Sequence, residues 1–185
     1  TPREREWRSC RHCEALFWDG DAGFKGLCQR GGVHEADAGP NYSLEIGSAD
    51  DAQNQPDWHR CRKCFALFWN GRAPQTGLCP GGDLHEVGGP ALRLPHLSIE
   101  DDANHQRWWR FCRKCAGLFF DGFDDKGACP RDGLPHIAQG LEFVIPHELP
   151  EDATHQSFWR FCNRCDACYD CRLQENVCNI FKIFI

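Results

Sequence analysis

The sequence contains no methionine, only two tyrosines and no apolar run that approaches 18 residues. A helix that crosses a bilayer needs about 20 apolar residues, so a membrane-spanning helix is excluded. Charged residues make up 26% and hydrophobic residues 41% of the chain, which excludes a disordered tail. No signal-peptide pattern is present, and the missing methionine predicts a processed chain or a fragment, with an extracellular location slightly favoured.

Cysteine is abundant instead, with 14 residues among 185, beside nine histidines and seven tryptophans. Four C-x2-C pairs recur at nearly constant intervals, and a fixed period of this size is typical of a repeat architecture. The pairs are Cys10/Cys13, Cys61/Cys64, Cys112/Cys115 and Cys162/Cys165. We therefore divide the chain into repeats at 1–57, 58–108 and 109–158, followed by a partial fourth repeat and a divergent tail at 159–185.

Each full repeat carries the same ordered features: a tryptophan before the first cysteine, a Leu-Phe-aromatic segment, Asp/Asn-Gly, Gly-x-Cys and a histidine. Alternating apolar residues predict strands over 42–46 and 141–145, and Asp/Asn-Gly after an apolar run predicts a hairpin turn. No window has a sustained helical period. We expect an all-β fold with irregular loops. The zinc-stabilised, ribbon-like repeats would form a linear array or a pseudo-threefold closed body that the partial fourth repeat seals.

Three cysteines and one histidine per repeat favour a metal over disulfides, because three thiols cannot pair within a repeat. Three thiolates and one imidazole complete a tetrahedral zinc site with no open position, which predicts three structural zinc ions. The predicted ligands are Cys10, Cys13, Cys28 and His34; Cys61, Cys64, Cys79 and His85; Cys112, Cys115, Cys129 and His136. A possible fourth ion would use Cys162, Cys165, Cys168 and Cys171. A disulfide network between repeats remains the alternative, since the cysteine total is even and the tail is cysteine-dense.

These segments resemble zinc ribbons, with a knuckle such as 61–64, a hairpin through Asn70-Gly71, and a second half-knuckle at 79–82 closed by His85. They also resemble a poorly characterised tandem-repeat type found in bacterial and fungal proteins. The resemblance covers residues 7 to about 165. It implies a metal-bound repeat and no particular activity.

Function is therefore interpreted from the chemistry of the repeats. We expect a non-enzymatic binding module for a protein or a carbohydrate, in a lectin-like manner, without a membrane. The candidate ligand-binding residues are an aromatic ring and its polar neighbour in each repeat: Trp18, Asp19, Trp69, Asn70, Phe120 and Asp121. They could instead be core residues and turn residues. The tryptophans at 7, 58, 109 and 159 are expected to pack over the metal knuckles.

Two other classes of function are weighed against this interpretation. A nucleic-acid-binding zinc ribbon is favoured by the cations and aromatics of two knuckles, but the net charge of −6 opposes it. Catalysis is disfavoured because the metal claims every cysteine of the full repeats. The acidic pairs at 50–51, 101–102 and 151–152 lack the ligand spacing of a calcium loop.

Overall fold

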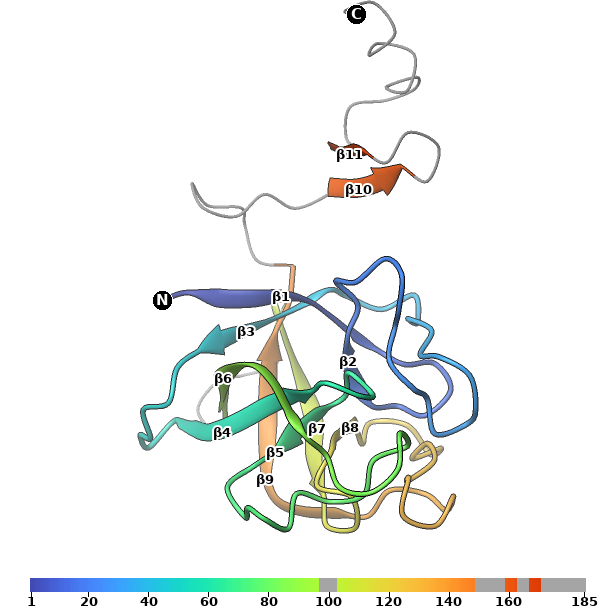
Figure 1. Cartoon of the computed structure of the whole chain (residues 1–185). Helices are drawn as coiled ribbons and strands as arrows, with labels where there is room; N and C mark the ends of the chain where they lie inside the picture. Colours follow the sequence, from blue (N-terminus) through green and yellow to red (C-terminus); the bar gives the residue numbers. More distant parts are fainter. Residues whose placement is uncertain (97–102, 149–158, 163–166, 171–185) are drawn as a thin grey trace, which may run out of the picture. The chain divides into compact units, whose positions relative to one another are not determined.

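The computed structural model describes residues 1–96 and 103–148, and the backbone of 159–162 and 167–170. The chain divides into two compact units, Thr1–Leu149 and Pro150–Ile185, which are treated separately. Every regular element in the described residues is a β-strand, as Figure 1 shows. The all-β prediction is therefore confirmed, and none of these residues forms a helix that could cross a membrane.

Each full repeat contributes one long strand, flanked by a short strand and a return strand. The first repeat has β1 (Arg3–Ser9), β2 (Leu16–Trp18) and β3 (Tyr42–Ile46). The second has β4 (Asn54–Cys61), β5 (Leu67–Trp69) and β6 (Val87–Pro95), and the third has β7 (His105–Cys112), β8 (Leu118–Phe120) and β9 (Ala138–Pro146). Because β4 and β7 begin before the predicted boundaries at 58 and 109, each repeat is counted below from the start of its long strand. All pairings are antiparallel, in sheets of order β2-β1-β3-β6-β4-β5 and β8-β7-β9. The strands predicted over 42–46 and 141–145 are β3 and part of β9.

The three repeats close on one another through equivalent backbone hydrogen bonds. The donors and acceptors are Trp18 N to Phe65 O at 3.0 Å, Trp69 N to Ala116 O at 3.0 Å, and Phe120 N to Glu14 O at 3.1 Å. Repeat one thus joins repeat two, two joins three, and three joins one. The first unit is a pseudo-threefold closed body. The third repeat bonds directly to the first, so the three full repeats join in a ring among themselves; the sealing expected of the partial fourth repeat falls largely on residues outside the described part of the chain.

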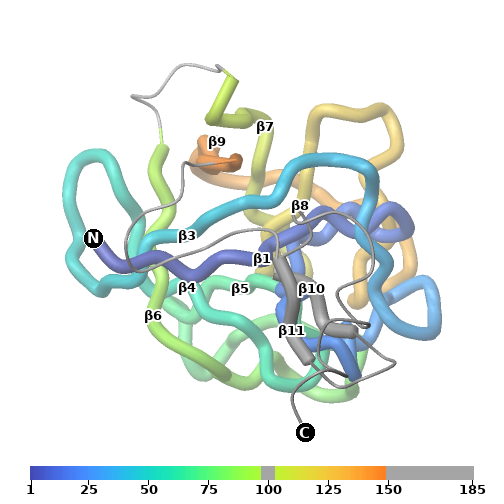
Figure 2. The backbone as a smooth tube through the Cα atoms, turned by 90° about the horizontal axis from the view of Figure 1, so that it is seen from above, coloured from blue at the N-terminus to red at the C-terminus, as the bar shows by residue number. Residues whose placement is uncertain are grey.

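Each long strand is bulged immediately before its tryptophan. Glu6, Asp57 and Trp108 adopt left-handed conformations with φ of 66°, 65° and 69°, and the strand registers shift there. A bulge of this kind bends a strand and increases its twist. The freed carbonyls accept hydrogen bonds of 2.7 to 2.8 Å from the backbone N–H of residues 19, 70 and 121, in the Asp/Asn-Gly segments. In the view of Figure 2, β5 and β8 lie toward the middle of the body and loops lie at its periphery.

The predicted Asp/Asn-Gly hairpins are wrong. The hairpins run instead across the C-x2-C knuckles, where β4 pairs with β5 so that Trp58 faces Trp69 and Arg60 faces Leu67. The segment after Asn70 is a loop that leads to β6 rather than a tight turn back onto β5. The Asn-Gly pair indicated a hairpin turn, but the backbone N–H of Asn70 donates to the carbonyl of the bulged residue Asp57 instead of to a hairpin partner.

The central core is shared by all three repeats. Trp7, Trp58 and Trp109 are fully buried in one cluster with aliphatic and aromatic residues of the return strands, such as Leu92 and Phe143. Trp58 packs edge-on against Phe143, with ring centroids 5.1 Å apart. The expectation that these tryptophans cover the metal knuckles is therefore wrong. They face the middle of the body because the antiparallel register places them opposite buried residues of the return strands.

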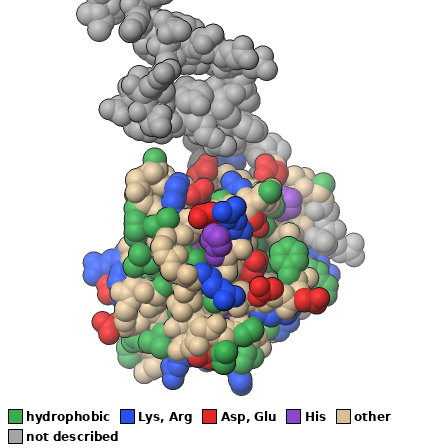
Figure 3. Space-filling model, turned by 90° about the vertical axis from the view of Figure 1, so that its right-hand side faces the viewer, with side chains coloured by type: hydrophobic (Ala, Val, Ile, Leu, Met, Phe, Trp, Pro, Cys, Tyr) green, Lys and Arg blue, Asp and Glu red, His purple; other side chains and the backbone are tan. Residues whose placement is uncertain are grey.

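The surface of the first unit carries mixed charges. On the face shown in Figure 3, cationic and acidic side chains are interspersed. The second unit contains one antiparallel hairpin, β10 (Trp159–Cys162) with β11 (Ala167–Asp170). Of the possible fourth metal site, Cys165 and Cys171 lie outside the described residues, as do the side chains of Cys162 and Cys168.

Candidate metal centres

The first two cysteines of each set lie on the knuckle between the long strand and the short strand. A hydrogen bond of 2.9 Å closes the knuckle, from the N–H of the residue after the second cysteine to the carbonyl of the first, in Glu14, Phe65 and Ala116. These three residues are left-handed, with φ of 60°, 59° and 59°. This turn directs both thiols of the pair to one side of the hairpin.

The third cysteine and the histidine lie on a second loop. In repeat two, the N–H of Cys79 bonds to Asp83 O and the N–H of His85 bonds to Gly77 O, each at 3.0 Å. In repeat three, the corresponding acceptors are Leu134 and Lys126. The separation of the third cysteine and the histidine is one residue longer in repeat three than in repeat two, and the change of acceptors accommodates this difference while the four ligands still come together.

The predicted ligands come together in three buried clusters. They are Cys10, Cys13, Cys28 and His34; Cys61, Cys64, Cys79 and His85; Cys112, Cys115, Cys129 and His136, with the potential ligand atoms of each cluster within 4.8 Å of one another. All twelve side chains are at most 6% exposed. The structure thus places every residue of the three predicted sets where one ion could be held.

The spacing of the ligand atoms fits tetrahedral zinc. Zn–S bonds of about 2.3 Å and Zn–N bonds of about 2.0 Å place two sulfurs about 3.8 Å apart, and sulfur and nitrogen about 3.5 Å apart. The first and third cysteines have Sγ–Sγ distances of 3.9, 3.8 and 3.9 Å. The second cysteine and the histidine Nδ1 are separated by 3.6, 3.5 and 3.6 Å. The agreement indicates that Nδ1 is the ligating nitrogen in each cluster.

The nine cysteines of the three full repeats form no disulfide in this structure. A disulfide requires an S–S distance of about 2.05 Å, so sulfurs 3.8 to 3.9 Å apart are not bonded. All nine cysteines of the three clusters are free. These nine cysteines are therefore placed to act as metal ligands.

The thiols of a cluster hold their protons unequally. In repeat two, hydrogen bonds with Cys64 and Cys79 hold the pKa of Cys61 far below its usual value. The hydrogen bond with Cys61 raises the pKa of Cys79 to about 11. For Cys64, the hydrogen bond with Cys61, together with burial, raises the pKa well above its usual value. A metal cation binds the thiolate form of cysteine. Metal binding must therefore release the protons of Cys64 and Cys79, the two thiols whose pKa is raised.

Phenylalanine packs against the metal-site histidine in each repeat. The ring pairs are Phe17 with His34, Phe68 with His85 and Phe119 with His136, stacked with centroids 4.7 to 5.0 Å apart and interplanar angles of 14° to 19°. This contact fixes the plane of the imidazole. We did not predict this role from sequence, although the signal existed, because the middle residue of the Leu-Phe-aromatic segment is phenylalanine in all three repeats.

A glycine from the neighbouring repeat packs against each knuckle. A Cβ on Gly26, Gly77 or Gly127 would collide with the carbonyl of Cys64, Cys115 or Cys13, respectively. All three glycines have positive φ, between 66° and 79°. Glycine is required at these positions for two reasons: the close approach and the left-handed backbone. Through these glycines, each metal-binding knuckle packs directly against the neighbouring repeat of the ring.

The six candidate ligand-binding residues are largely engaged within the chain. Phe120 is buried, and Trp18 and Trp69 are partly buried against the central core. Asp19 and Asp121 form ion pairs with Lys25 and Lys126 at 2.8 and 3.0 Å. The Trp18 ring is also covered by the Arg60 guanidinium, 3.9 Å from the ring centroid. This packing does not support three equivalent aromatic platforms for a sugar.

Comparison with models of protein families, with curated proteins and with solved structures finds no match for this chain. The resemblance to zinc-binding tandem repeats therefore stands on the three Cys3His clusters themselves, which fit such repeats in ligand type, spacing and burial.

Proposed function

We propose that this protein is a non-enzymatic binding module in which three zinc ions are structural and a protein is the ligand. The observation that carries the proposal is the saturation of each candidate cage by four buried protein ligands. A catalytic zinc ion normally keeps one position for water or substrate. A structural ion needs no such position, and it stabilises units of about 50 residues that are too small to bury a large core alone.

A protein ligand is favoured over a glycan by the packing of the candidate rings. A sugar platform needs an open aromatic face beside free hydrogen-bonding groups. Phe120 has no such face, since it is 9% exposed and packs against Trp109 with centroids 5.3 Å apart. The carboxylates that follow Trp18 and Phe120 in sequence, Asp19 and Asp121, are held by lysines of the same chain.

Nucleic acid is the weaker alternative because three of the knuckle cations already have acidic partners. Lys63 and Lys114 pair with Glu86 and Asp132 at 3.1 and 2.8 Å, and Arg62 also pairs with Glu86. Phosphate contacts would have to displace these carboxylates, which lowers the gain from each contact.

The structural role of the metal is tested by replacing zinc with cobalt in the full chain. We expect a tetrahedral thiolate spectrum that does not change when cyanide or azide is added, because no coordination position is open. A spectral shift on addition of either anion would show an exchangeable position and would overturn the non-catalytic assignment.

The class of ligand is tested by presenting the zinc-loaded chain to peptide arrays, glycan arrays and single-stranded oligonucleotides at moderate salt. We expect saturable binding to a set of peptides. Tight oligonucleotide binding that weakens steeply with salt would contradict the proposal, as would binding to glycans alone.

A further inference from the structure

A cavity of about 190 Å³ lies between the second and third repeats, apart from the metal centres. Its lining residues are Asp50, Gln55, Pro56, Asp57, Trp69, His96 and Leu141. The volume is below the 300 Å³ at which sites for drug-sized ligands begin, so the cavity suits a group the size of one side chain.

The two carboxylates of the cavity have no cation of their own. Asp50 and Asp57 are exposed and form no ion pair within the described part of the chain, whereas the adjacent Asp51 pairs with Arg93 at 3.1 Å. Asp57 is held in place by the bulge, at φ 65°. Two unpaired carboxylates beside one small cavity attract positive charge.

A buried histidine adds a second, independent indication of a ligand. His96 lines the cavity and is 9% exposed, and its Nδ1 is buried without a hydrogen-bond partner among the described residues. A buried polar atom without a partner is costly and uncommon in folded proteins. A polar ligand in the cavity would satisfy it.

The remaining polar groups make the cavity richer in acceptors than in donors. The indole N–H of Trp69 already donates to Pro56 O at 3.1 Å, and Gln55 Oε1 accepts from Trp58 at 3.1 Å. The open groups are therefore chiefly the two carboxylates, next to an aromatic ring. A cation with N–H donors matches this set better than a sugar, whose hydroxyls need donors as well as acceptors.

An arginine of this chain covers Trp18, the residue of the first repeat that corresponds to Trp69. At the junction of the first and second repeats, Arg60 covers Trp18 and lies 3.9 Å from the Glu4 carboxylate. At the junction of the second and third, the residue equivalent to Arg60 is Phe111. Trp69 is approached instead by Arg72, whose guanidinium carbon lies 5.7 Å from the ring centroid, compared with 3.9 Å for Arg60 at Trp18. Among the described residues, Arg72 forms no ion pair with Asp50 or Asp57, so these two carboxylates lack the cation that Glu4 has in Arg60.

We propose that this cavity binds the side-chain ammonium or guanidinium group of a lysine or arginine in a partner peptide. The proposal rests on the binding-module function above and deepens it, because it names the chemistry of the protein ligand. The carboxylates of Asp50 and Asp57 would hold the cation, and Trp69 would contact the side chain that carries it.

The test uses the zinc-loaded full chain and follows the indole N–H resonance of Trp69 by NMR, assigned with the variant Trp69→Phe. The probes are blocked pentapeptides of glycine and serine with one central lysine, arginine, norleucine or acetyl-lysine, together with a neutral methyl glycoside. We expect saturable shifts with lysine and arginine only, with a dissociation constant on the order of 1 mM. Added salt should weaken them.

Matched variants separate the cavity from general surface charge. Asp57→Asn should weaken lysine-peptide binding about fivefold, and Asp50→Asn with Asp57→Asn about tenfold or more. Asp83→Asn is the control, because Asp83 is an exposed acid of the same repeat at another left-handed position, φ 55°, where asparagine is tolerated. It should leave binding unchanged.

Three results would overturn the inference: no shift at peptide concentrations about tenfold above that constant, equal shifts with norleucine, or stronger shifts with the glycoside. None of these results would by itself overturn the binding-module function. If the peptide arrays still show saturable binding, only the cavity assignment fails; if they show none, the function fails as well.

Discussion

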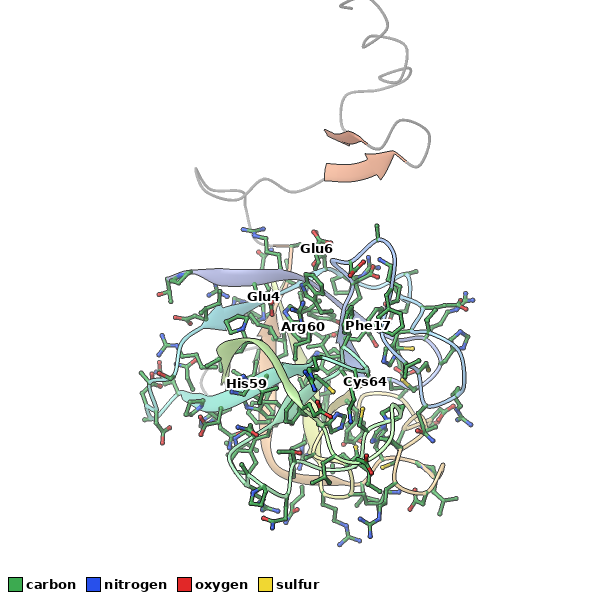
Figure 4. All side chains as sticks on the ribbon, viewed as in Figure 1. Glu4, Glu6, Phe17, His59, Arg60 and Cys64 are labelled. Atoms are coloured by element: carbon green, nitrogen blue, oxygen red, sulfur yellow. The ribbon has the colours of Figure 1, made fainter. Side chains whose placement is uncertain are left out.

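Arg60 and Phe111 occupy equivalent positions, two residues after the core tryptophans of the second and third repeats, and each packs on the aromatic ring of the preceding repeat. At the first junction, the Arg60 guanidinium lies 3.9 Å from the centroid of Trp18 and 3.9 Å from the Glu4 carboxylate. Figure 4 labels Arg60 and Glu4, which come from β4 and β1. At the second junction, Phe111 packs edge-on against Trp69 at 5.8 Å.

The acidic partner changes together with the arginine. Glu4 stands three residues before its tryptophan, where the other repeats have Gln55 and Gln106, whose side-chain oxygens accept from Trp58 and Trp109. Burial raises the pKa of Glu4, and the charge of Arg60 lowers it only in part. The first junction therefore carries a partly buried charge pair. At the second, neutral Gln55 replaces the acid, and the cation is Arg72 from the loop after β5, which lies 5.7 and 5.8 Å from the ring centroids of Trp69 and Phe111.

The backbone at both junctions is nevertheless the same. The hydrogen bonds from residues 18 and 69 to the next knuckle are both 3.0 Å, and a glycine packs on a knuckle carbonyl in each case. The comparison teaches that zinc knuckles and glycine contacts set the ring, while the side chains between repeats can be polar or apolar.

Loss of a zinc ligand should have the largest effect, and an equal one at both junctions. Cys64→Ala and Cys115→Ala should each remove one ion and destabilise the protein by on the order of 10 kcal/mol, enough to unfold the affected repeat. Elemental analysis and thermal unfolding measure both effects. Arg62→Ala, within a knuckle but exposed, should keep all three ions; loss of zinc in this control would contradict the assignment.

Filling a junction glycine should come next. Gly26→Ala and Gly77→Ala should each cost about 3 kcal/mol or more, because the new methyl group meets a carbonyl that cannot move without disturbing the cage. Gly82→Ala is the control: it has φ 86° but open space around it, so only backbone strain of about 1 kcal/mol is expected. Urea unfolding with zinc present measures the difference, and equal costs for Gly77 and Gly82 would refute the contact.

Breaking the polar junction on one side should have a smaller effect. Arg60→Phe leaves the Glu4 carboxylate partly buried without its cation, which should cost about 2 kcal/mol in urea unfolding. An unchanged free energy of unfolding would show that the Arg60–Glu4 pair does not stabilise the junction. The two junctions would then differ in chemistry but not in stability.

Converting the first junction into the second should have the smallest effect. Glu4→Gln with Arg60→Phe gives the first repeat boundary the side chains of the second, and should lie within about 1 kcal/mol of the parent. The double-mutant cycle then reports a coupling between the two positions. If the double variant loses as much as the sum of the single variants, the junctions are not interchangeable.

Sequence reasoning reached the metal ligands more reliably than the packing around them. Cysteine and histidine at a repeated spacing have few chemical uses, so the twelve ligands could be predicted and the structure brings each set together. The strands over 42–46 and 141–145 were predictable from alternation. Both predictions use information that is local in sequence.

The packing depends on contacts between repeats, which spacing does not encode. Trp7, Trp58 and Trp109 keep a constant offset from the ligands, yet their strand register turns them into the shared core. Asp/Asn-Gly resembles a hairpin turn but binds the bulge of the long strand. The cavity at Trp69 requires Leu141 from another repeat, so no single repeat could indicate it.

The zinc content of the purified full chain, measured by elemental analysis together with a count of free thiols, tests the central claim most directly. The account predicts at least three zinc ions per chain, with the nine cysteines of the three clusters reduced. A zinc content near zero with these thiols oxidised would contradict it.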